Sequence, residues 1–353
     1  MSRFFSKKYA ALTPYTPGEQ PRDQKYIKLN TNESPFPPSA RVLEAVSTEA
    51  AKAQLYSDPE CFALRCKIAE AYGVSPDCVI AVNGSDEVLN FAFMAFGDKD
   101  FAFPDISYGF YKVFADVNNV PYTAMPLNDD FTINLDDYIA CGKSIVIPNP
   151  NAPTGILLSL SDIEKLAQSN PDSVVIIDEA YIDFGGVSAI NHTKKYENLL
   201  VTRTFSKSFS LAGARLGFAV GSPELIADLN TIRNSTNPYN VNRMTQAAGI
   251  AAIEDMDYYM TNAQTVAENR AFALSELKGR GFEATDSTAN FIFVKAPFLS
   301  GGELYTRLRE KGILVRHWDS ERISDYCRIT VGTKQQMEAL ITAIDELKEE
   351  ITQ

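Results

Sequence analysis

The stretch TFSKSFSLAGARLGF, residues 204–218, follows the apolar run SVVIIDEAY, residues 173–181, and the two together decide the fold. The apolar run is rich in β-branched residues, which is typical of a strand that is buried on both faces of a parallel sheet. It carries a carboxylate, Asp178, and a phenol, Tyr181, at its carboxyl end, and the later stretch adds an amine, Lys207. Most lysines are solvated surface groups, so it is the order of these groups that points to chemistry.

Strands and helices alternate on both sides of these two stretches. This alternation predicts a three-layer α/β domain with a largely parallel sheet. The expected strands are 78–84, 100–105, 121–127, 144–150, 173–180, 199–206 and 216–222, and the expected helices are 86–96, 108–119 and 159–168, after two earlier helices that begin near residues 39 and 63.

The regular alternation of predicted strands and helices ends near residue 242. The expected elements are a long helical region over 243–280, a strand over 291–297, a helix over 302–312, strands over 313–318 and 326–332, and a last helix over 334–351. Their order indicates a smaller α+β domain. With 353 residues, 45% of them hydrophobic, the chain can form two cores. We therefore expect an N-terminal arm over 1–38 that joins the small domain, a large domain over 39–241 and a small C-terminal domain over 242–353.

Composition narrows the function. The formal net charge is −12, which argues against nucleic-acid binding because that needs a basic surface. Five scattered cysteines without a CxxC pair, and only two histidines, make a zinc site improbable, so we expect no metal. The polar N-terminus and the absence of any run of about 18 apolar residues predict a cytoplasmic protein that does not bind membranes.

The groups at the ends of the two opening stretches match the needs of pyridoxal phosphate (PLP) chemistry. That cofactor requires an amine that can bond to its aldehyde, an anion for its ring nitrogen and a phenol for its ring oxygen. Lys207 supplies the amine, Asp178 the anion and Tyr181 the phenol.

Seven short motifs carry a family resemblance: NESPF (32–36), NGSDE (83–87), PDISYGFY (104–111), NPNAPTG (149–155), IIDEAY (176–181), TFSKSFSLAGARLG (204–217) and YCRITVGT (326–333). In this order they resemble the fold-type-I PLP-dependent aminotransferases, and within them the chain is most similar to histidinol-phosphate aminotransferases. The resemblance implies transamination between histidinol phosphate and 2-oxoglutarate in histidine biosynthesis, with PLP as cofactor and small-molecule substrates.

The resemblance also implies roles for single residues. Lys207 would bond to the cofactor and shuttle a proton, Asp178 would pair with the ring nitrogen, and Tyr181 would donate to the ring oxygen. Tyr108 would stack on the ring. The phosphate would bind where a strand turns into a helix, since helix N-termini favour anions, with hydroxyls and a guanidinium from the lysine stretch. This phosphate set comprises Gly84, Ser85, Asp86, Thr204, Ser206 and Arg215.

One position departs from the family pattern. The family has asparagine immediately before Pro-Thr-Gly, where this chain has Ala152. Either Asn151 makes the missing contact to the ring oxygen from one residue back, or Tyr181 makes it alone.

The substrate contacts that the resemblance implies come from distant parts of the chain. Arg328 would bind the α-carboxylate of the oxo acid, and Arg316 would bind the substrate phosphate, because bidentate guanidinium groups suit both anions. Tyr15 and Asn32 would close over the substrate. Tyr56 would reach the cofactor phosphate of a neighbouring subunit, which implies a homodimer with shared sites.

Three alternatives remain open at this point. An aromatic amino-acid aminotransferase or a threonine-phosphate decarboxylase would keep the cofactor and change the substrate. A non-catalytic PLP-binding regulator would need a basic DNA-binding extension, and the net charge of −12 speaks against it.

Overall fold

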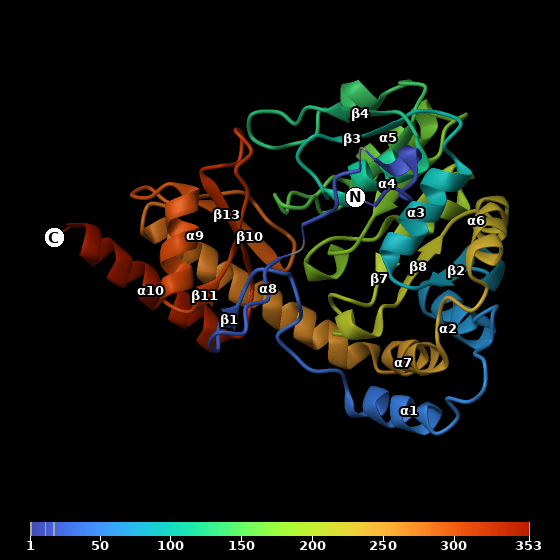
Figure 1. Ribbon diagram of the computed structural model, residues 1–353, viewed down its shortest axis with the longest axis horizontal. Helices are drawn as coiled ribbons and strands as arrows, with labels where there is room; N and C mark the ends of the chain where they lie inside the picture. Colours follow the sequence, from blue (N-terminus) through green and yellow to red (C-terminus); the bar gives the residue numbers. More distant parts are fainter. Residues whose placement is uncertain (1, 11, 17, 353) are drawn as a thin grey trace.

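The computed structural model describes residues 2–10, 12–16 and 18–352. Its larger part is built around a sheet of seven strands, several of which are labelled in Figure 1. The strand order is β2-β8-β7-β6-β5-β3-β4. All neighbouring strands run parallel except β8, which is antiparallel to β2 and to β7. The predicted, mostly parallel sheet is thus confirmed. Its strands are β2 (Val79–Val82), β3 (Phe101–Pro104), β4 (Tyr122–Met125), β5 (Ser144–Pro148), β6 (Val175–Asp178), β7 (Leu199–Thr204) and β8 (Gly217–Val220).

Helices cover both faces of this sheet, as the apolar strands require. Successive side chains of a strand point to opposite faces. In β6, Ile177 packs in one core with α2 (Phe62–Tyr72) and α5 (Leu160–Ser169), whereas Ile176 packs in another core with helices on the opposite face. Those helices are α3 (Ser85–Ala95), α4 (Phe110–Asn118) and α6 (Pro223–Thr236).

The smaller part is a four-stranded antiparallel sheet in the order β12-β13-β10-β9. Its strands are β9 (Glu283–Ala284), β10 (Phe291–Lys295), β12 (Arg316–His317) and β13 (Tyr326–Thr330), and its helices are α9 (Gly301–Glu310) and α10 (Lys334–Thr352). The N-terminal arm joins this part, because β1 (Ile27–Lys28) pairs in parallel with β11 (Ile313–Leu314). The single strand expected at 313–318 is therefore two strands with different partners.

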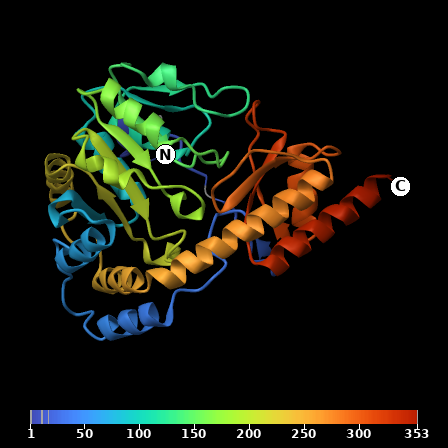
Figure 2. The ribbon, with the colours of Figure 1, turned by 180° about the vertical axis from the view of Figure 1, so that it is seen from behind.

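The helical region expected over residues 243–280 consists of two helices with different surroundings. The first, α7 (Arg243–Glu254), packs on α1 (Ala40–Ala50) and α2, and its Ala251 and Ala252 belong to the core of the large sheet. The second, α8 (Met256–Gly279), crosses from one part to the other (Figure 2). Packing thus places α7 with the large domain, whereas the predicted boundary at 242 placed it with the small one. We propose a boundary inside α8.

Short 3₁₀ helices occupy several connections, at Lys7–Tyr9, Pro76–Cys78, Leu135–Tyr138, Ile182–Phe184, Ala189–Lys194 and Ala212–Ala214. Among the described residues, no helix has both the length and the apolar character needed to cross a membrane.

Candidate active site

A cavity of about 400 Å³ lies at the carboxyl edge of the large sheet. Pro148 and Asp178 end β5 and β6, and Thr204 ends β7, so the three parallel strands deliver side chains to one place. The wall of the cavity contains nine of the residues predicted from the sequence: Ser85, Asp86, Tyr108, Asp178, Tyr181, Thr204, Ser206, Lys207 and Arg215.

Asp178 is buried, and its carboxylate accepts hydrogen bonds from two side chains. Tyr111 donates to Oδ2 at 2.8 Å, and Thr202 donates to Oδ1 at 3.5 Å. Burial raises the pKa of this carboxyl from 3.8 to about 6, although the bond from Tyr111 opposes that rise. A buried carboxylate on the cavity wall attracts a cationic ring nitrogen, which would return its pKa towards ordinary values.

Lys207 and Tyr181 face each other across the same cavity. The ammonium nitrogen of Lys207 lies 5.6 Å from the centre of the Tyr181 ring and donates to the carbonyl of Thr31 at 3.4 Å. The Tyr181 hydroxyl accepts a hydrogen bond of 3.1 Å from the side chain of Asn32. Its own proton is therefore available for an acceptor inside the cavity.

The turn that carries Lys207 is fixed from outside the cavity. The hydroxyl of Ser208 donates to Asp183 at 2.5 Å, and the carboxylate of Asp183 pairs with the buried guanidinium of Arg203. A buried, paired network of this kind restrains the backbone next to it. The position of the reactive amine is thereby fixed relative to the ends of β6 and β7.

One end of the cavity is suited to an anion. The helix α3 begins there, and its cap residue, Gly84, supplies no capping side chain for the first backbone N–H groups. Gly84 has a φ of +85°, a backbone conformation that residues with a side chain rarely adopt, so glycine is favoured there. The hydroxyls of Thr204 and Ser206 complete this end.

Asp86 contributes in a way that the sequence did not reveal. Its carboxylate accepts a hydrogen bond of 2.9 Å from the hydroxyl of Tyr108 and pairs with Arg215 at 3.3 Å. A carboxylate repels a phosphate, so only the backbone N–H of Asp86 is suited to an anion. The side chain instead orients Tyr108 and Arg215.

Asn151 does not reach the cavity. Its side-chain amide donates to the carbonyl of Ile106 and to the hydroxyl of Thr154, both at 3.0 Å, and the residue is buried. Ala152, at the position where the family has asparagine, lines the cavity instead. Of the two possibilities left by the sequence, the arrangement favours Tyr181 as the donor to the ring oxygen.

A second cavity of about 440 Å³ adjoins the first and shares five wall residues with it: Thr31, Tyr108, Ala152, Tyr181 and Lys207. The four predicted substrate residues all line this second cavity: Tyr15, Asn32, Arg316 and Arg328. Lys207 therefore lies at the junction of a cofactor-sized space and a substrate-sized space.

Asn32 and the two arginines show how the arm builds this second cavity. Asn32 adopts a φ of +56°, and Thr330 of β13 donates to its side-chain oxygen at 3.0 Å. Arg328 donates to the carbonyl of Asn30 at 3.0 Å, and Arg316 donates to that of Thr16 at 3.1 Å. The Nε atom of Arg328 is enclosed without a hydrogen-bond partner among the described residues, and burial lowers the pKa of this guanidinium. The Nε–H group of Arg328 can therefore donate a hydrogen bond to a bound anion.

Three functional neighbours escaped the sequence analysis: Tyr111 and Thr202 beside Asp178, and Trp318 beside the two arginines. The register of the parallel pair sets Thr202 opposite Asp178, and that register is a tertiary property. Tyr111 stands in the quoted motif PDISYGFY, and its membership of that motif was the available signal.

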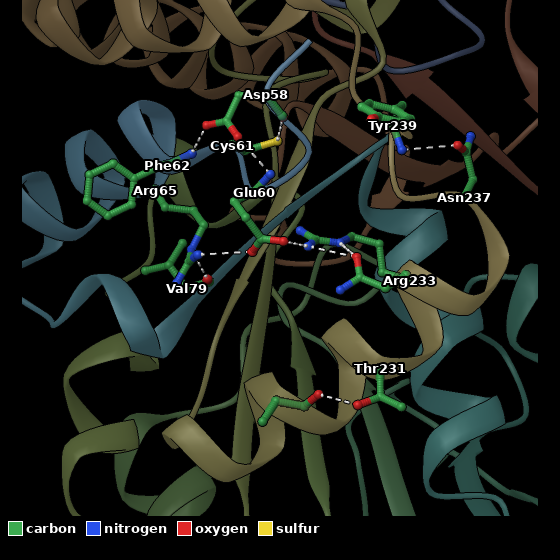
Figure 3. A network of polar contacts seen from close by, with 12 residues as sticks. Asp58, Glu60, Cys61, Phe62, Arg65, Val79, Thr231, Arg233, Asn237 and Tyr239 are labelled. Carbon is green, nitrogen blue, oxygen red and sulfur yellow. Dashed lines mark hydrogen bonds and ion pairs between the residues drawn. The ribbon is translucent and has the colours of Figure 1, made fainter. Parts of the chain in front are cut away.

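Tyr56, which was predicted to bind the cofactor phosphate of a neighbouring subunit, lines neither cavity. It is 81% exposed and stacks on Tyr239, with ring centres 4.6 Å apart. The loop that carries it is held in place, because Arg243 donates to the carbonyls of Leu55 and Tyr56. Figure 3 shows the next part of this loop, where Glu60 accepts from the buried guanidinium of Arg233 at 3.1 Å.

A lysine, a carboxylate and a phenol around a space with an anion-binding end define the class of PLP-dependent enzymes that share this fold. The model of the family Aminotransferase class I and II matches residues 24–344. The chain belongs to this family of class I and II aminotransferases.

Related proteins are similar in sequence to this protein over almost the whole chain. A histidinol-phosphate aminotransferase of Clostridium acetobutylicum is 48% identical over 98% of this chain and 99% of its own length. A second protein of that name, from Syntrophus aciditrophicus, is 49% identical over 97% of each chain. The crystal structure of histidinol-phosphate aminotransferase from Sinorhizobium meliloti in complex with pyridoxal-5'-phosphate shares the fold, with a TM-score of 0.89 at 22% identity over 99% of each chain.

The residues of the first cavity fit the cofactor that this family membership implies, PLP. Asp178 can hold the ring nitrogen, Tyr181 the ring oxygen and Lys207 the aldehyde carbon. The positive φ of Gly84 favours glycine in the turn before α3, and a turn without a side chain lets a phosphate approach the backbone N–H groups. Each polar group of PLP therefore has a partner of suitable charge.

Proposed function

We propose that this enzyme transfers the amino group between histidinol phosphate and 2-oxoglutarate, in histidine biosynthesis. The observation that carries the proposal is the pair of arginines, Arg316 and Arg328, on the wall of the substrate cavity next to Lys207. An aminotransferase for apolar amino acids needs one cation, for the α-carboxylate. A second arginine suits a distal anion, and the phosphate of histidinol phosphate and the side-chain carboxylate of glutamate both supply one.

The residues have distinct roles in this reaction. PLP, when bound, supplies an electron-accepting ring that stabilises negative charge at the substrate Cα. Asp178 would keep the ring nitrogen protonated, because a buried carboxylate and a cation beside it stabilise each other's charged forms. The amine of Lys207 lies at the junction of the two cavities, where it can take the proton from Cα and return it to the cofactor carbon. Arg328 orients glutamate and 2-oxoglutarate through their α-carboxylate.

The site is completed by a second copy of the chain in this proposal. An 81% exposed tyrosine, held on a restrained loop and stacked on Tyr239, is organised for contact with something outside the chain. A homodimer would bring Tyr56 to the cofactor phosphate of the partner, beside the amino end of α3. A cytoplasmic location is part of the same proposal, since it suits free cysteines and a pathway of soluble metabolites.

A panel of amino donors tests the proposed substrate. The holoenzyme is mixed with histidinol phosphate, glutamate, phenylalanine, tyrosine or threonine phosphate, and each half-reaction is followed by cofactor absorbance. We expect the highest kcat/KM for histidinol phosphate. A higher value for phenylalanine or tyrosine would make the protein an aromatic aminotransferase, and carbon dioxide release from threonine phosphate would make it a decarboxylase.

A further inference from the structure

Trp318 is the only tryptophan of the chain, and it lies between the two arginines of the substrate cavity. It follows β12 directly. The guanidinium carbon of Arg316 is 5.4 Å from the centre of the indole, and that of Arg328 is 5.3 Å from it. Both distances are within the range of a cation–π interaction. One aromatic ring therefore contacts both cations that face the substrate.

The indole is held firmly on its other side. It packs against an apolar cluster contributed by both parts of the molecule: Ile106, Leu127, Phe131, Phe293 and Ile323. The segment after Trp318 is anchored as well, because Arg322 pairs with Asp105 at 3.1 Å and donates to the carbonyl of Leu127 at 2.9 Å. The position of the ring is thus fixed independently of the arginines.

Two neighbouring guanidinium groups repel each other, more strongly in a cavity than in water. Arg316 donates to the carbonyl of Thr16 at 3.1 Å, and Arg328 donates to that of Asn30 at 3.0 Å. Arg316 begins the two-residue strand β12, and its bond to Thr16 is exposed to solvent, whereas the bond of Arg328 to Asn30 is partly buried. The negative face of an indole attracts both cations and offsets part of their repulsion.

We propose that Trp318 is the specificity-determining residue of the substrate cavity. By holding Arg316 beside Arg328, the indole keeps a second anion-binding group aimed at the substrate. The enzyme thereby selects acidic substrates, either dicarboxylates or phosphate monoesters, over amino acids with apolar side chains. The inference rests on the proposed function for the identity of the phosphate monoester, but glutamate alone suffices to test it.

The kinetic test compares Trp318→Leu and Trp318→Phe with the wild-type holoenzyme. Loss of the aromatic face raises KM for glutamate and for histidinol phosphate about tenfold, and the weaker face of phenylalanine raises it about threefold. The kcat values stay near wild type, because an indole takes no part in the proton transfer that Lys207 carries out. KM for phenylalanine, which has no distal anion, changes less than about twofold. A Trp318→Leu enzyme with unchanged KM for glutamate would overturn the inference.

A matched control removes a different aromatic ring from the same cluster. Tyr326 stacks on Phe293 at 4.7 Å and packs against the apolar cluster, but it does not line the substrate cavity. Tyr326→Leu should leave both KM values within about twofold of wild type. If this control raised KM as much as Trp318→Leu did, the effect would belong to the cluster and not to the indole. Should Trp318→Leu fail to fold, the threefold effect of Trp318→Phe decides.

Fluorescence gives a readout that does not depend on turnover. Because Trp318 is the single tryptophan, the indole emission of the holoenzyme reports on this position alone. Titration with succinate or inorganic phosphate, neither of which can react, should change that emission saturably, and Arg316→Ala should abolish most of the change. If neither succinate nor phosphate changed the indole emission, the inference would be overturned. If the wild-type enzyme did not turn over histidinol phosphate while succinate still changed the emission, the proposed function would fail and the specificity role would stand.

Discussion

The hydroxyl of Tyr111 donates a hydrogen bond of 2.8 Å to Oδ2 of Asp178, 67 residues further along the chain. This bond joins the first turn of α4 to the end of β6. It favours the charged form of a carboxyl whose burial favours the neutral form. The ionisation of Asp178 therefore depends on a residue outside the motif that contains it.

We expect Tyr111→Phe to shift the acid limb of the kcat/KM profile to higher pH. Without the donor, the pKa of Asp178 rises further, and the carboxylate that holds the ring nitrogen is lost at a higher pH than in the wild type. A hydrogen bond to a charged group contributes about 1.5–3 kcal/mol, which corresponds to about one to two pH units. Tyr138→Phe is the matched control, because that buried hydroxyl has no hydrogen-bond partner among the described residues. An unmoved acid limb in Tyr111→Phe would contradict the assignment.

Asp178→Asn should stabilise the cofactor-free protein at neutral pH. The pKa of Asp178 is raised from 3.8 to about 6 by burial, so between these values the unfolded chain loses a proton that the folded chain retains. The contribution of this group to stability falls across that window as pH rises. The advantage of the variant should grow from near zero at pH 4 to about 3 kcal/mol above pH 6, measured by urea unfolding. If the difference in unfolding free energy between the variant and the wild type were constant across this pH range, the raised pKa of Asp178 would be refuted.

Lys207→Ala should lose the covalent link to PLP and most of the turnover. Borohydride reduction of the wild-type holoenzyme followed by peptide mapping should label the peptide that contains Lys207. We expect the variant to carry no label and to be slower by at least about 10²–10⁴-fold, the contribution of a positioned proton-transfer group. Lys278→Ala is the control, because that lysine makes only a surface ion pair with Asp286. Label on another lysine of the wild-type enzyme would assign the covalent link to that lysine and not to Lys207.

Hybrid dimers test whether Tyr56 acts in the partner's site. Lys207→Ala and Tyr56→Ala chains, each of low activity alone, are mixed, unfolded and refolded together. One site of each hybrid then has both residues intact, and about a quarter of wild-type activity should return. Mixing Lys207→Ala with Asp178→Asn gives no such rescue if both residues act within their own chain. Monomers by light scattering at micromolar concentration would remove the basis of the proposal.

Substitutions of the two arginines should slow different half-reactions, and single-turnover kinetics can measure each half-reaction by itself. Arg316→Ala should reduce kcat/KM for histidinol phosphate about 10- to 150-fold, the range of a lost charge-assisted bond. Arg328→Ala should damage the glutamate half-reaction most, because histidinol phosphate has no carboxylate for it to bind. If Arg316→Ala spared histidinol phosphate and slowed an aromatic amino acid, the aromatic aminotransferase would become the better description.

Much of the site was predictable because it lies at the ends of apolar runs. Asp178 and Thr204 end two neighbouring parallel strands, and the carboxyl ends of such strands necessarily meet at one edge. The arm residues Tyr15 and Asn32 were placed by resemblance alone, and they do line the substrate cavity. Asn151 shows the limit of this reasoning, since the direction of its side chain depends on Ile106 and Thr154, which the sequence does not place.

The sequence by itself determined the three layers, the order of the chemical groups and the family, because apolar periodicity and motif order are local properties of the chain. Only the tertiary structure decided that α7 packs with the large sheet, that Tyr111 supports Asp178 and that Trp318 lies between Arg316 and Arg328. Each of these contacts joins residues from separate elements, so each depends on how side chains pack after the elements have formed.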